Sequence, residues 1–458
     1  MKTTAQNPYF IHYFGTPLFN EQARAIQQLP DGSIYLAGYS NASGNVNPAV
    51  IKLNVGGDSL WMKTYGDSTF SEAFFMNRSG ATDLVLVGEQ TGNLTGTDVM
   101  IIKIDSAGNV LWKSVIATAK NESGKYIEQT QDGGFILCGF QSDDFGFNDI
   151  FLAKLDATGA LSWTKKFGGI ENDYANQVHE QSDGSLILTA DTRSKGAGGY
   201  DVEVLKLSPA GDMIWDYTYG DEFENGCQGI CLAANGDLIS YGETEIAPFS
   251  PFDFFIQRID QDGTSLWKKV FGGSGSDAAF SIVEDDGGNL ILTGYSNSNN
   301  VDEPIDIAIA KTDATGNLLW INNYGTSGID IGYGIIKAEN GFLIVATAFN
   351  EGSNDFCLLY LSAEGLLTGA NQPLSGQENQ HSIFVYPNPS TGLFTITFNE
   401  AVENGSMRIF SVLGAMVFES EIANRATHMK LALDITPGIY KMLIQSESGN
   451  RSITIEVQ

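Results

Sequence analysis

Six tryptophans recur along the first three quarters of the chain at an almost constant spacing. They are all the tryptophans among the 458 residues, and they lie at Trp61, Trp112, Trp163, Trp215, Trp267 and Trp320. Successive members are 51, 51, 52, 52 and 53 residues apart, and Phe10 stands 51 residues before the first. A period of about 50 residues indicates an array of equivalent units, each of which buries one face against its neighbour.

Each unit contains four short apolar runs separated by turn residues. In the unit that begins at Trp267, these runs are residues 278–284, 289–295, 305–311 and 317–325. Runs of this length, rich in Ile, Val, Leu and aromatic residues and divided by glycine-containing turns, are typical of β-strands. Four strands in a repeat of about 50 residues predict a β-propeller blade.

There are seven units when Phe10 is counted with the six tryptophans. The Trp strand of each unit belongs with the three strands before it. The strand at residues 10–14 therefore has no earlier partner, and the last unit lacks a fourth strand. We expect residues 10–14 to complete the seventh blade and close the ring, which leaves no open sheet edge. This assigns residues 1–368 to an all-β, seven-bladed β-propeller of four-stranded blades.

Two series of polar, mostly acidic residues recur in loops on one face of the predicted propeller. The first precedes the third strand of each unit, at Asn47, Asp98, Asp149, Asp201, Asp253, Asp306 and Asp355. The second follows the fourth strand, at Asn20, Ser71, Glu122, Asp173, Asn225, Asp277 and Asp330. Such side chains accept backbone N–H groups in turns, and carboxylates also bind Ca²⁺. Since residues 260–263 supply only a fragment of a Ca²⁺-binding loop, we expect turn capping and neither metal nor cofactor, with Ca²⁺ as the alternative.

Three neighbouring units differ from the others in the loop between their second and third strands. These loops, at residues 141–149, 191–201 and 243–253, are longer and carry aromatic and acidic residues. The candidate ligand-binding residues there are Phe145, Phe147, Tyr200, Phe249, Phe252, Asp143, Asp144, Glu243 and Glu245. Aromatic rings beside carboxylates suit a glycan or a peptide. The alternative is that the rings only pack their own loops.

Catalytic constellations are scarce in this sequence. It has four histidines, and neither a Ser-His-Asp set nor an HExxH metal site can be assembled from them. His179 lies on a predicted innermost strand near the channel, where a structural role is the simpler interpretation. Paired carboxylates that cleave a polysaccharide remain open, because an acidic face supplies many candidates. We therefore name no catalytic residue.

The formal net charge is −30, from 55 acidic and 25 basic residues. Nucleic acids need clustered Lys and Arg, so this charge excludes them as partners, and self-repulsion favours a monomer. No run of about 20 apolar residues is present, so no transmembrane segment is expected. The first ten residues lack the features of a secretory signal, so either the protein is cytoplasmic or the numbering begins after a removed signal.

The repeat stops after residue 368. Residues 369–382 are polar and contain Gly, Pro, Asn and Gln, which is typical of a linker. Residues 383–458 then contain about seven short apolar runs, and their number and turn spacing predict a small immunoglobulin-like β-sandwich.

An ordered set of short motifs runs through residues 383–458. It consists of Tyr386, Pro387, Asn388, Pro389, Gly392, Gly414, Gly438 and Tyr440. Together these motifs resemble the C-terminal sorting domain of type IX secretion cargo in Bacteroidota. The resemblance implies export to the periplasm, recognition by the type IX machinery, and release or attachment at the outer-membrane surface. The repeats likewise resemble those of secreted Bacteroidota propellers of unassigned activity, and that likeness transfers no catalytic residue.

These features predict a secreted or surface-displayed propeller that acts as a binding or structural module. Its partners would be the type IX machinery and a glycan or a surface protein. The alternative is an extracellular lyase or hydrolase that cleaves a polysaccharide at the channel mouth. A cluster of Lys, Arg, His or Tyr with carboxylates in that mouth would favour the enzyme, and an unbroken acidic and amide lining would favour the binding module.

Overall fold

The structure, a computed structural model, divides the chain into two compact units, one of which spans Phe10–Leu366. In that unit it describes residues 10–15, 19–66, 70–92, 96–298, 304–350, 352–363 and 365–366. In the C-terminal unit it describes residues 383–386, 393–402, 405–411, 416–423, 426–433, 435–436, 438–446 and 449–457. These residues form strands, turns and loops and contain no helix. The described fold is therefore all-β, as the sequence predicts.

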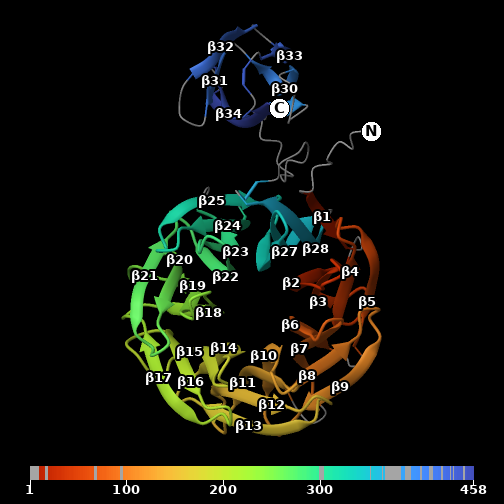
Figure 1. The fold of residues 1–458 in the computed structure, drawn as a ribbon, viewed down its shortest axis with the longest axis vertical. Helices are drawn as coiled ribbons and strands as arrows, with labels where there is room; N and C mark the ends of the chain where they lie inside the picture. The colour runs from red at the N-terminus through yellow and green to blue at the C-terminus, as the bar shows by residue number, and fades with distance from the viewer. Residues whose placement is uncertain are drawn as a thin grey trace. The chain divides into compact units, whose positions relative to one another are not determined.

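The first unit consists of seven four-stranded antiparallel sheets, or blades, around a central channel (Figure 1). The innermost strands are β2 (Glu21–Gln28), β6 (Ser71–Ser79), β10 (Glu122–Gln129), β14 (Asp173–Glu180), β18 (Asn225–Leu232), β22 (Asp277–Glu284) and β26 (Ile331–Ala338). The second strands are β3 (Ile34–Ser40), β7 (Asp83–Thr91), β11 (Phe135–Ser142), β15 (Leu186–Thr192), β19 (Leu238–Thr244), β23 (Leu290–Ser296) and β27 (Gly341–Asn350).

The outer half of each blade completes the sheet. The third strands are β4 (Asn47–Leu53), β8 (Thr97–Ile104), β12 (Asn148–Leu155), β16 (Asp201–Leu207), β20 (Asp253–Ile259), β24 (Asp306–Thr312) and β28 (Ser353–Ser362). The outermost strands are β5 (Ser59–Thr64), β9 (Val110–Ile116), β13 (Leu161–Phe167), β17 (Met213–Tyr219), β21 (Ser265–Phe271), β25 (Leu318–Tyr324) and β1 (Phe10–Phe14). Blade 1 is β2–β5, and the blades are numbered along the chain to blade 7, which is β26, β27, β28 and β1.

The connections between strands fall on two faces, because consecutive strands are antiparallel. The connections from second to third strands lie on one face, together with those from an outermost strand to the next innermost strand. We call this the loop face. The three loops singled out in the sequence all belong to it, since they join β11 to β12, β15 to β16 and β19 to β20.

Strand β1 completes the seventh blade. It pairs antiparallel with β28, with Phe10 opposite Tyr360 and Phe14 opposite Phe356. The Phe10 ring also contacts the next blade, because a Cβ added to Gly57 in the β4–β5 turn would come within 2.3 Å of it. One end of the propeller sequence therefore supplies one strand of blade 7 and the other end supplies three.

The repeated tryptophans fill the space between consecutive blades. A Cβ added to Gly108, in the β8–β9 turn of blade 2, would lie 2.7 Å from the ring of Trp61 in blade 1. Gly108 also has a φ of +77°, which glycine adopts without strain. The same contact joins Trp112 to Gly159 in the following blade. Packing between blades, rather than stacking on a ligand, therefore explains the tryptophan repeat.

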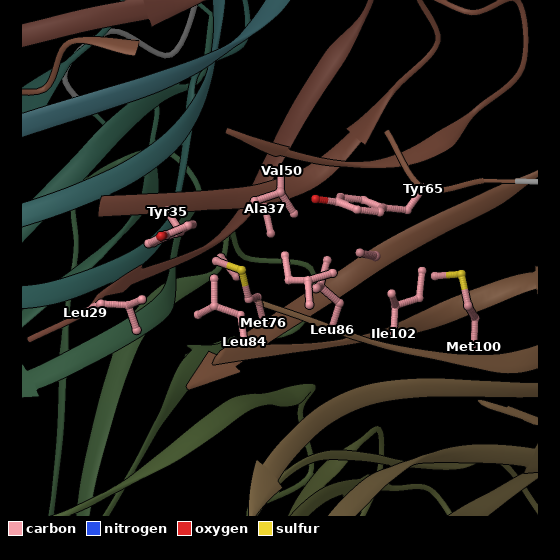
Figure 2. Packing of buried hydrophobic residues seen from close by; sticks show 13 residues of the cluster. Leu29, Tyr35, Ala37, Val50, Tyr65, Met76, Leu84, Leu86, Met100 and Ile102 are labelled. Atoms are coloured by element: carbon pink, nitrogen blue, oxygen red, sulfur yellow. The ribbon is translucent and has the colours of Figure 1, made fainter. Parts of the chain in front are cut away.

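Apolar side chains from facing sheets form the core between blades. Figure 2 shows the cluster between blades 1 and 2, in which Ala37 of β3 and Val50 of β4 lie opposite Leu86 of β7 and Ile102 of β8. Because each blade packs on both faces, β3 and β4 are buried at all positions except one each. The blades thus form a rigid frame around the channel.

The C-terminal domain is a β-sandwich with its own core. Its strands are β29 (Ile383–Tyr386), β30 (Leu393–Val402), β31 (Gly405–Ser411), β32 (Met416–Ile422), β33 (Ala426–Ala432), β34 (Gly438–Ser446) and β35 (Gly449–Val457). They form two antiparallel sheets, in the orders β29-β30-β33 and β32-β31-β34-β35. Buried residues of both sheets make one cluster, which includes Ile396, Met407, Leu431, Met442 and Val457.

Candidate functional site

Polar residues at the start of the innermost strands hold the loop face together. Asp173 is fully buried and accepts the N–H of Gly169 at 2.9 Å. It also accepts the hydroxyls of Thr192 at 2.5 Å and Ser194 at 2.7 Å. Equivalent bonds to the backbone of the preceding loop are accepted by Glu122, Asp277 and Asp330. At these positions the series therefore caps turns.

The sequence prediction for this series was wrong by one residue in blade 1. There the capping position is Glu21, which is buried and lies opposite Ser40, as Asp173 lies opposite Thr192. Asn20 is exposed. Glu21 lies six positions after Gly15, whereas Asp173 lies five after Gly168. A count of five residues from the glycine that ends the outermost strand therefore reaches Asn20 in blade 1, one residue before Glu21.

The fragment that suggested a Ca²⁺ loop forms an ordinary turn. The carboxylate of Asp260 accepts the N–H groups of Asp262 at 3.0 Å and Thr264 at 2.8 Å, as such turn residues commonly do. Among the residues that the structure describes, no three His, Cys, Asp or Glu side chains converge as a metal site.

Two of the candidate aromatic rings lie exposed at loop tips. Phe145 is 88% exposed and Phe249 is 98% exposed, while Phe147 is 40% exposed. Phe249 also has a φ of +61°, a left-handed conformation that bulky residues rarely adopt. Phe145 and Phe249 therefore do not pack their own loops, and the alternative interpretation is wrong for these two rings.

The other two candidate rings are partly buried and support the loops. The guanidinium of Arg193 lies 4.3 Å from the centroid of the Tyr200 ring. The centroid of the Tyr174 ring lies 6.1 Å from that of the Tyr200 ring. Phe252, immediately before β20, accepts the N–H of Asp277 with its carbonyl at 2.7 Å. Tyr200 and Phe252 therefore pack within the loop face.

The two acidic candidates in the first loop are already engaged. Asp143 accepts the backbone N–H groups of Phe145 at 2.7 Å and Phe147 at 2.9 Å. Asp144 forms an ion pair with Lys120. These carboxylates shape the loop that presents Phe145.

The two acidic candidates in the third loop are separated by the strand end. Glu243 lies within β19 opposite Gly226 of β18, so it belongs to the channel mouth. Glu245 lies in the loop, and its N–H donates to the carbonyl of Glu224 at 2.9 Å. The structure therefore does not bring the candidate residues together in one site.

Each innermost strand contains one β-bulge at the same position, which the sequence analysis missed. In β2 the pairing register shifts between Ala23 and Ala25, and in β10 it shifts between Gly124 and Tyr126. The extra residue of each bulge lines the central channel, and we call these seven residues the bulge ring. From blade 1 to blade 7 they are Arg24, Phe74, Lys125, Asn176, Gln228, Phe280 and Tyr333. Equivalent positions thus carry cationic, aromatic and amide side chains, so the repeat symmetry is broken here.

The bulge ring surrounds a cavity of about 480 Å³. The Arg24 guanidinium lies 4.5 Å from the centroid of the Tyr333 ring, which is 5.4 Å from the Phe280 ring. The Lys125 Nζ lies 3.5 Å from the centroid of the Phe74 ring. Cations over ring faces are held in place, and the cavity falls within the range of roughly 300–1,000 Å³ typical of small-molecule sites.

Carboxylates occupy the channel mouth beside this ring. Glu72 lies opposite Glu89 in blade 2, and Asp191 and Glu243 lie on the second strands of blades 4 and 5. Burial raises the pKa of Glu72, and it raises the pKa values of Asp191 and Glu243 to about 7. Burial also lowers the pKa of Lys125. Groups with such shifts in or beside a cavity are typical of functional sites.

His179 has a structural role. Its Nδ1 lies 2.9 Å from a carboxylate oxygen of Glu128 and its Nε2 lies 3.1 Å from the carbonyl of Ile230. These partners belong to the innermost strands of the two neighbouring blades. His179 therefore links three blades, as the simpler interpretation of the sequence predicts.

Replacing Glu243 with Gln should flatten the pH dependence of stability. A carboxyl with a pKa of about 4.3 when unfolded and about 7 when folded favours the folded state while it is protonated. That contribution is complete below the unfolded pKa and is lost as pH rises through about 7. Between pH 5 and pH 8 we expect the melting temperature of wild type to fall by about 2 °C more than that of E243Q.

Melting curves at both pH values measure this difference. Asp191 and Tyr295 interact electrostatically with Glu243, and D191N should show an effect of the same sign. A wild-type protein and an E243Q variant with parallel pH profiles would mean that the folded pKa of Glu243 is not raised.

Part of the chain matches known family models. Residues 384–457 match the secretion system C-terminal sorting domain. Residues 29–58, which run from the β2–β3 turn through the β4–β5 turn, match a β-propeller domain of unknown function. Both matches agree with the resemblances that the sequence motifs indicate.

Comparisons with whole proteins and solved structures give more distant likenesses. The regulatory protein FlaEY of Caulobacter vibrioides is 27% identical over 196 residues, which are 37% of this chain and 20% of that protein. This chain thus spans about a fifth of the length of that curated relative. Among solved structures, PorZ, an essential surface component of the type IX secretion system of Porphyromonas gingivalis, aligns over 94% of this chain and 74% of its own with a TM-score of 0.34 and 10% identity. Sqt1 of Chaetomium thermophilum aligns over 78% of this chain and 98% of its own, with a TM-score of 0.45 and 12% identity.

The sorting-domain motif falls partly within the described residues. Tyr386 ends β29 and Gly438 begins β34. Tyr440 is buried, and its hydroxyl donates to the carbonyl of Thr436 at 2.6 Å. The motif residues that lie outside the described residues are Pro387, Asn388, Pro389, Gly392 and Gly414.

Together, these findings describe a β-propeller that carries a type IX sorting domain, which indicates export to the cell surface or beyond. No helix among the described residues is long and apolar enough to cross a membrane.

Proposed function

We propose that this protein is an exported binding module that docks a partner protein on its loop face. The observation that carries this proposal is the exposure of Phe145 at 88% and Phe249 at 98% on loops of blades 3 and 5. Ile170, between β13 and β14, and Ile246 are also exposed, at 82% and 62%. Apolar tips gathered on one face of a soluble domain mark interaction surfaces, and aromatic anchors carry much of the binding energy at protein interfaces.

A protein suits these tips better than a glycan does. Sugar recognition needs free hydrogen-bonding groups beside an aromatic face. Near Phe145, Asp143 accepts two backbone N–H groups and Asp144 pairs with Lys120. Near Phe249, the Ser250 hydroxyl accepts the N–H of Ile246 at 3.1 Å. The nearby polar groups are thus occupied, whereas an apolar pocket on a partner needs none of them.

Replacing Phe145 and Phe249 together with serine should remove partner binding without unfolding the propeller. Exposed loop substitutions cost about 0.5 kcal/mol or less, so the melting temperature should change by about 2 °C or less. Loss of two aromatic anchors should weaken binding about 30-fold or more. A photo-reactive residue at position 145 or 249 identifies the partner at the surface of the exporting cell. The affinity of that partner for wild type and for the double variant is then measured.

Val55→Ser is the matched control. Val55 is 71% exposed and lies in the β4–β5 turn, on the face opposite the loop face. We expect V55S to bind as wild type does. If V55S and F145S/F249S bind the identified partner equally well, the loop tips do not form the interface.

A polysaccharide-cleaving enzyme is the second candidate. The observation in its favour is that Arg24, Lys125 and Tyr333 line the channel and that the carboxylates of Glu72 and Asp191 lie beside this lining, because acid–base cleavage needs groups that change protonation near neutral pH. Purified protein incubated with a polysaccharide panel would then release reducing ends or unsaturated products, and E243Q or D191N would release fewer. Equal release by wild type and both variants would remove these residues as candidates.

A further inference from the structure

Four charged side chains around the bulge ring of blades 1–3 face one another without forming ion pairs. Arg24 and Lys125 belong to the ring, and Glu72 and Glu89, which lie opposite each other in blade 2, interact with these cations. Both carboxylates attract Lys125 electrostatically, and Arg24 attracts Glu72. Nevertheless, within the described part of the chain no nitrogen of either cation lies within 4.0 Å of a carboxylate oxygen.

Several hydrogen-bond donors of these cations are unused. The Arg24 Nε is buried and has no hydrogen-bond partner among the described residues, and its guanidinium donates to Gln22 at 3.1 Å through Nη2. Lys125 Nζ contacts the faces of Phe74 at 3.5 Å and Phe140 at 5.6 Å from the ring centroids. Ring faces offer no lone pairs. The channel wall therefore presents directed donors and acceptors with space between them.

This arrangement does not serve the packing of the blades. The blades are held together by the capping residues, the tryptophans and the apolar clusters, all of which recur along the repeat. Removing charges from water without direct partners costs free energy. A costly, unrepeated arrangement around a cavity is best explained by a ligand that completes it.

The ligand must both donate and accept hydrogen bonds. Sugar hydroxyls do both, so one ring of hydroxyls can bridge carboxylates and cations that do not touch. The faces of Tyr333 and Phe280, whose rings lie 5.4 Å apart, offer the apolar surface on which sugar C–H groups stack. The four charges sum to zero and the whole protein carries −30, so an anionic ligand would be repelled from the channel mouth.

We propose that the central channel is a binding site for a neutral saccharide, either a short free sugar or the end of a glycan chain. Arg24, Lys125, Glu72 and Glu89 hold its hydroxyls, and Tyr333 and Phe280 hold its apolar face. This site does not depend on the loop face, so either proposal can fail without the other.

The test uses the full chain and defined probes. Glucose, galactose, mannose, N-acetylglucosamine and their common disaccharides are each offered at up to about 10 mM, with binding detected by saturation-transfer NMR and measured by calorimetry. We expect at least one probe to bind, and its affinity to change less than about twofold between low and high salt because it carries no charge. A polysaccharide that ends in the same sugar is then compared with the free sugar. Tighter binding of the polysaccharide identifies a glycan chain end as the ligand, and tighter binding of the free sugar identifies the free sugar.

Three variants decide whether the channel is the site. K125M and R24M keep side-chain length and lose the donors, so each should weaken binding about tenfold or more. Q228W fills the cavity without changing any charge and should abolish binding. K269M, on the outermost strand β21, is the control and should bind as wild type does. The double variant F145S/F249S should also bind the sugar normally.

Clear results would overturn the proposal. One is the absence of binding by any neutral probe to the folded wild-type protein. Another is equal binding by wild type and Q228W, since a filled channel cannot hold the ligand. A third is a preference for glucuronate over glucose that disappears at high salt, because it would mean that the ligand is an anion.

Discussion

A periplasmic reporter fused ahead of residues 369–458 is expected outside the outer membrane of a bacterium that has a type IX secretion system. The C-terminal domain matches the sorting-domain model over residues 384–457, and its two sheets share one buried cluster. A domain with its own core retains its fold when it is moved to another protein. With a Sec signal in front of the reporter, most of its activity should therefore appear in the medium or on the cell surface, as measured by fractionation.

Two controls separate sorting from leakage. The same reporter followed only by residues 369–382 should remain in the periplasm. Met442→Asp places a charge in the sandwich core, where Met442 is fully buried, and should also prevent export because an unpaired buried charge unfolds the domain. Retention of the complete fusion in cells that export their native cargo would contradict the assignment of this domain as a sorting signal.

The sequence predicted the blades because their packing problem repeats. Trp61 contacts Gly108 of the next blade, and each later tryptophan occupies the same position on its outermost strand. A period set by such contacts is visible without coordinates. The closing strand was predictable for the same reason, since Phe10 replaces tryptophan at the one position where the chain must return to its start.

The predicted capping bonds are present in blades 3, 4, 6 and 7, and the predicted position is wrong in blade 1. In blade 1 the loop after Gly15 is one residue longer, which shifted the prediction from Glu21 to Asn20. Loop lengths are set locally and carry no period. Positions counted across a loop are therefore less certain than positions counted within a strand.

The bulge ring was not predictable, because a bulge changes the side on which every later residue points. In β2, strict alternation would place Ala25 on the same face as Ala23. Because Arg24 is an extra residue in the pairing, Ala23 lies opposite Gly38 and Ala25 lies opposite the adjacent Ala37, so the two alanines lie on opposite faces of the sheet. The available hint was that the residue after a small, buried position varies from unit to unit, for example Arg24 in blade 1 and Lys125 in blade 3. That variation was visible, but only the fold shows that these residues surround one cavity.

The three candidate loops lie on one face of the propeller, as the sequence predicts, but their candidate residues do not form a single group. Exposure separates Phe145 and Phe249 from Phe252 and Tyr200. Glu243 has a different role again, because the second strand of blade 5 continues through it. Composition cannot distinguish a ring at a loop tip from a ring beneath it, since both are phenylalanines between turn residues.

Deleting residues 1–14 is expected to destabilise the whole propeller rather than one end of it. The deletion removes β1, whose five residues pair with β28, and its half-buried aromatic rings, including Phe10, Tyr13 and Phe14. Half-burial of three such rings contributes about 3 kcal/mol, so the melting temperature should fall by about 4 °C or more. Because each blade stabilises the next, thermal unfolding followed by circular dichroism should show one transition at a lower temperature.

A shorter deletion of residues 1–9, which keeps β1, is the matched control and should melt within about 2 °C of wild type. The longer deletion also leaves the edge of β28 open, with unpaired N–H and C=O groups that can pair with a second molecule. We therefore expect it to form concentration-dependent oligomers in light scattering, which the control should not form. A synthetic peptide of residues 8–15 should bind the truncated propeller and raise its melting temperature, because it supplies strand β1 to the open edge of β28. Unchanged melting of the longer deletion would mean that six complete blades and three strands of the seventh are stable without ring closure.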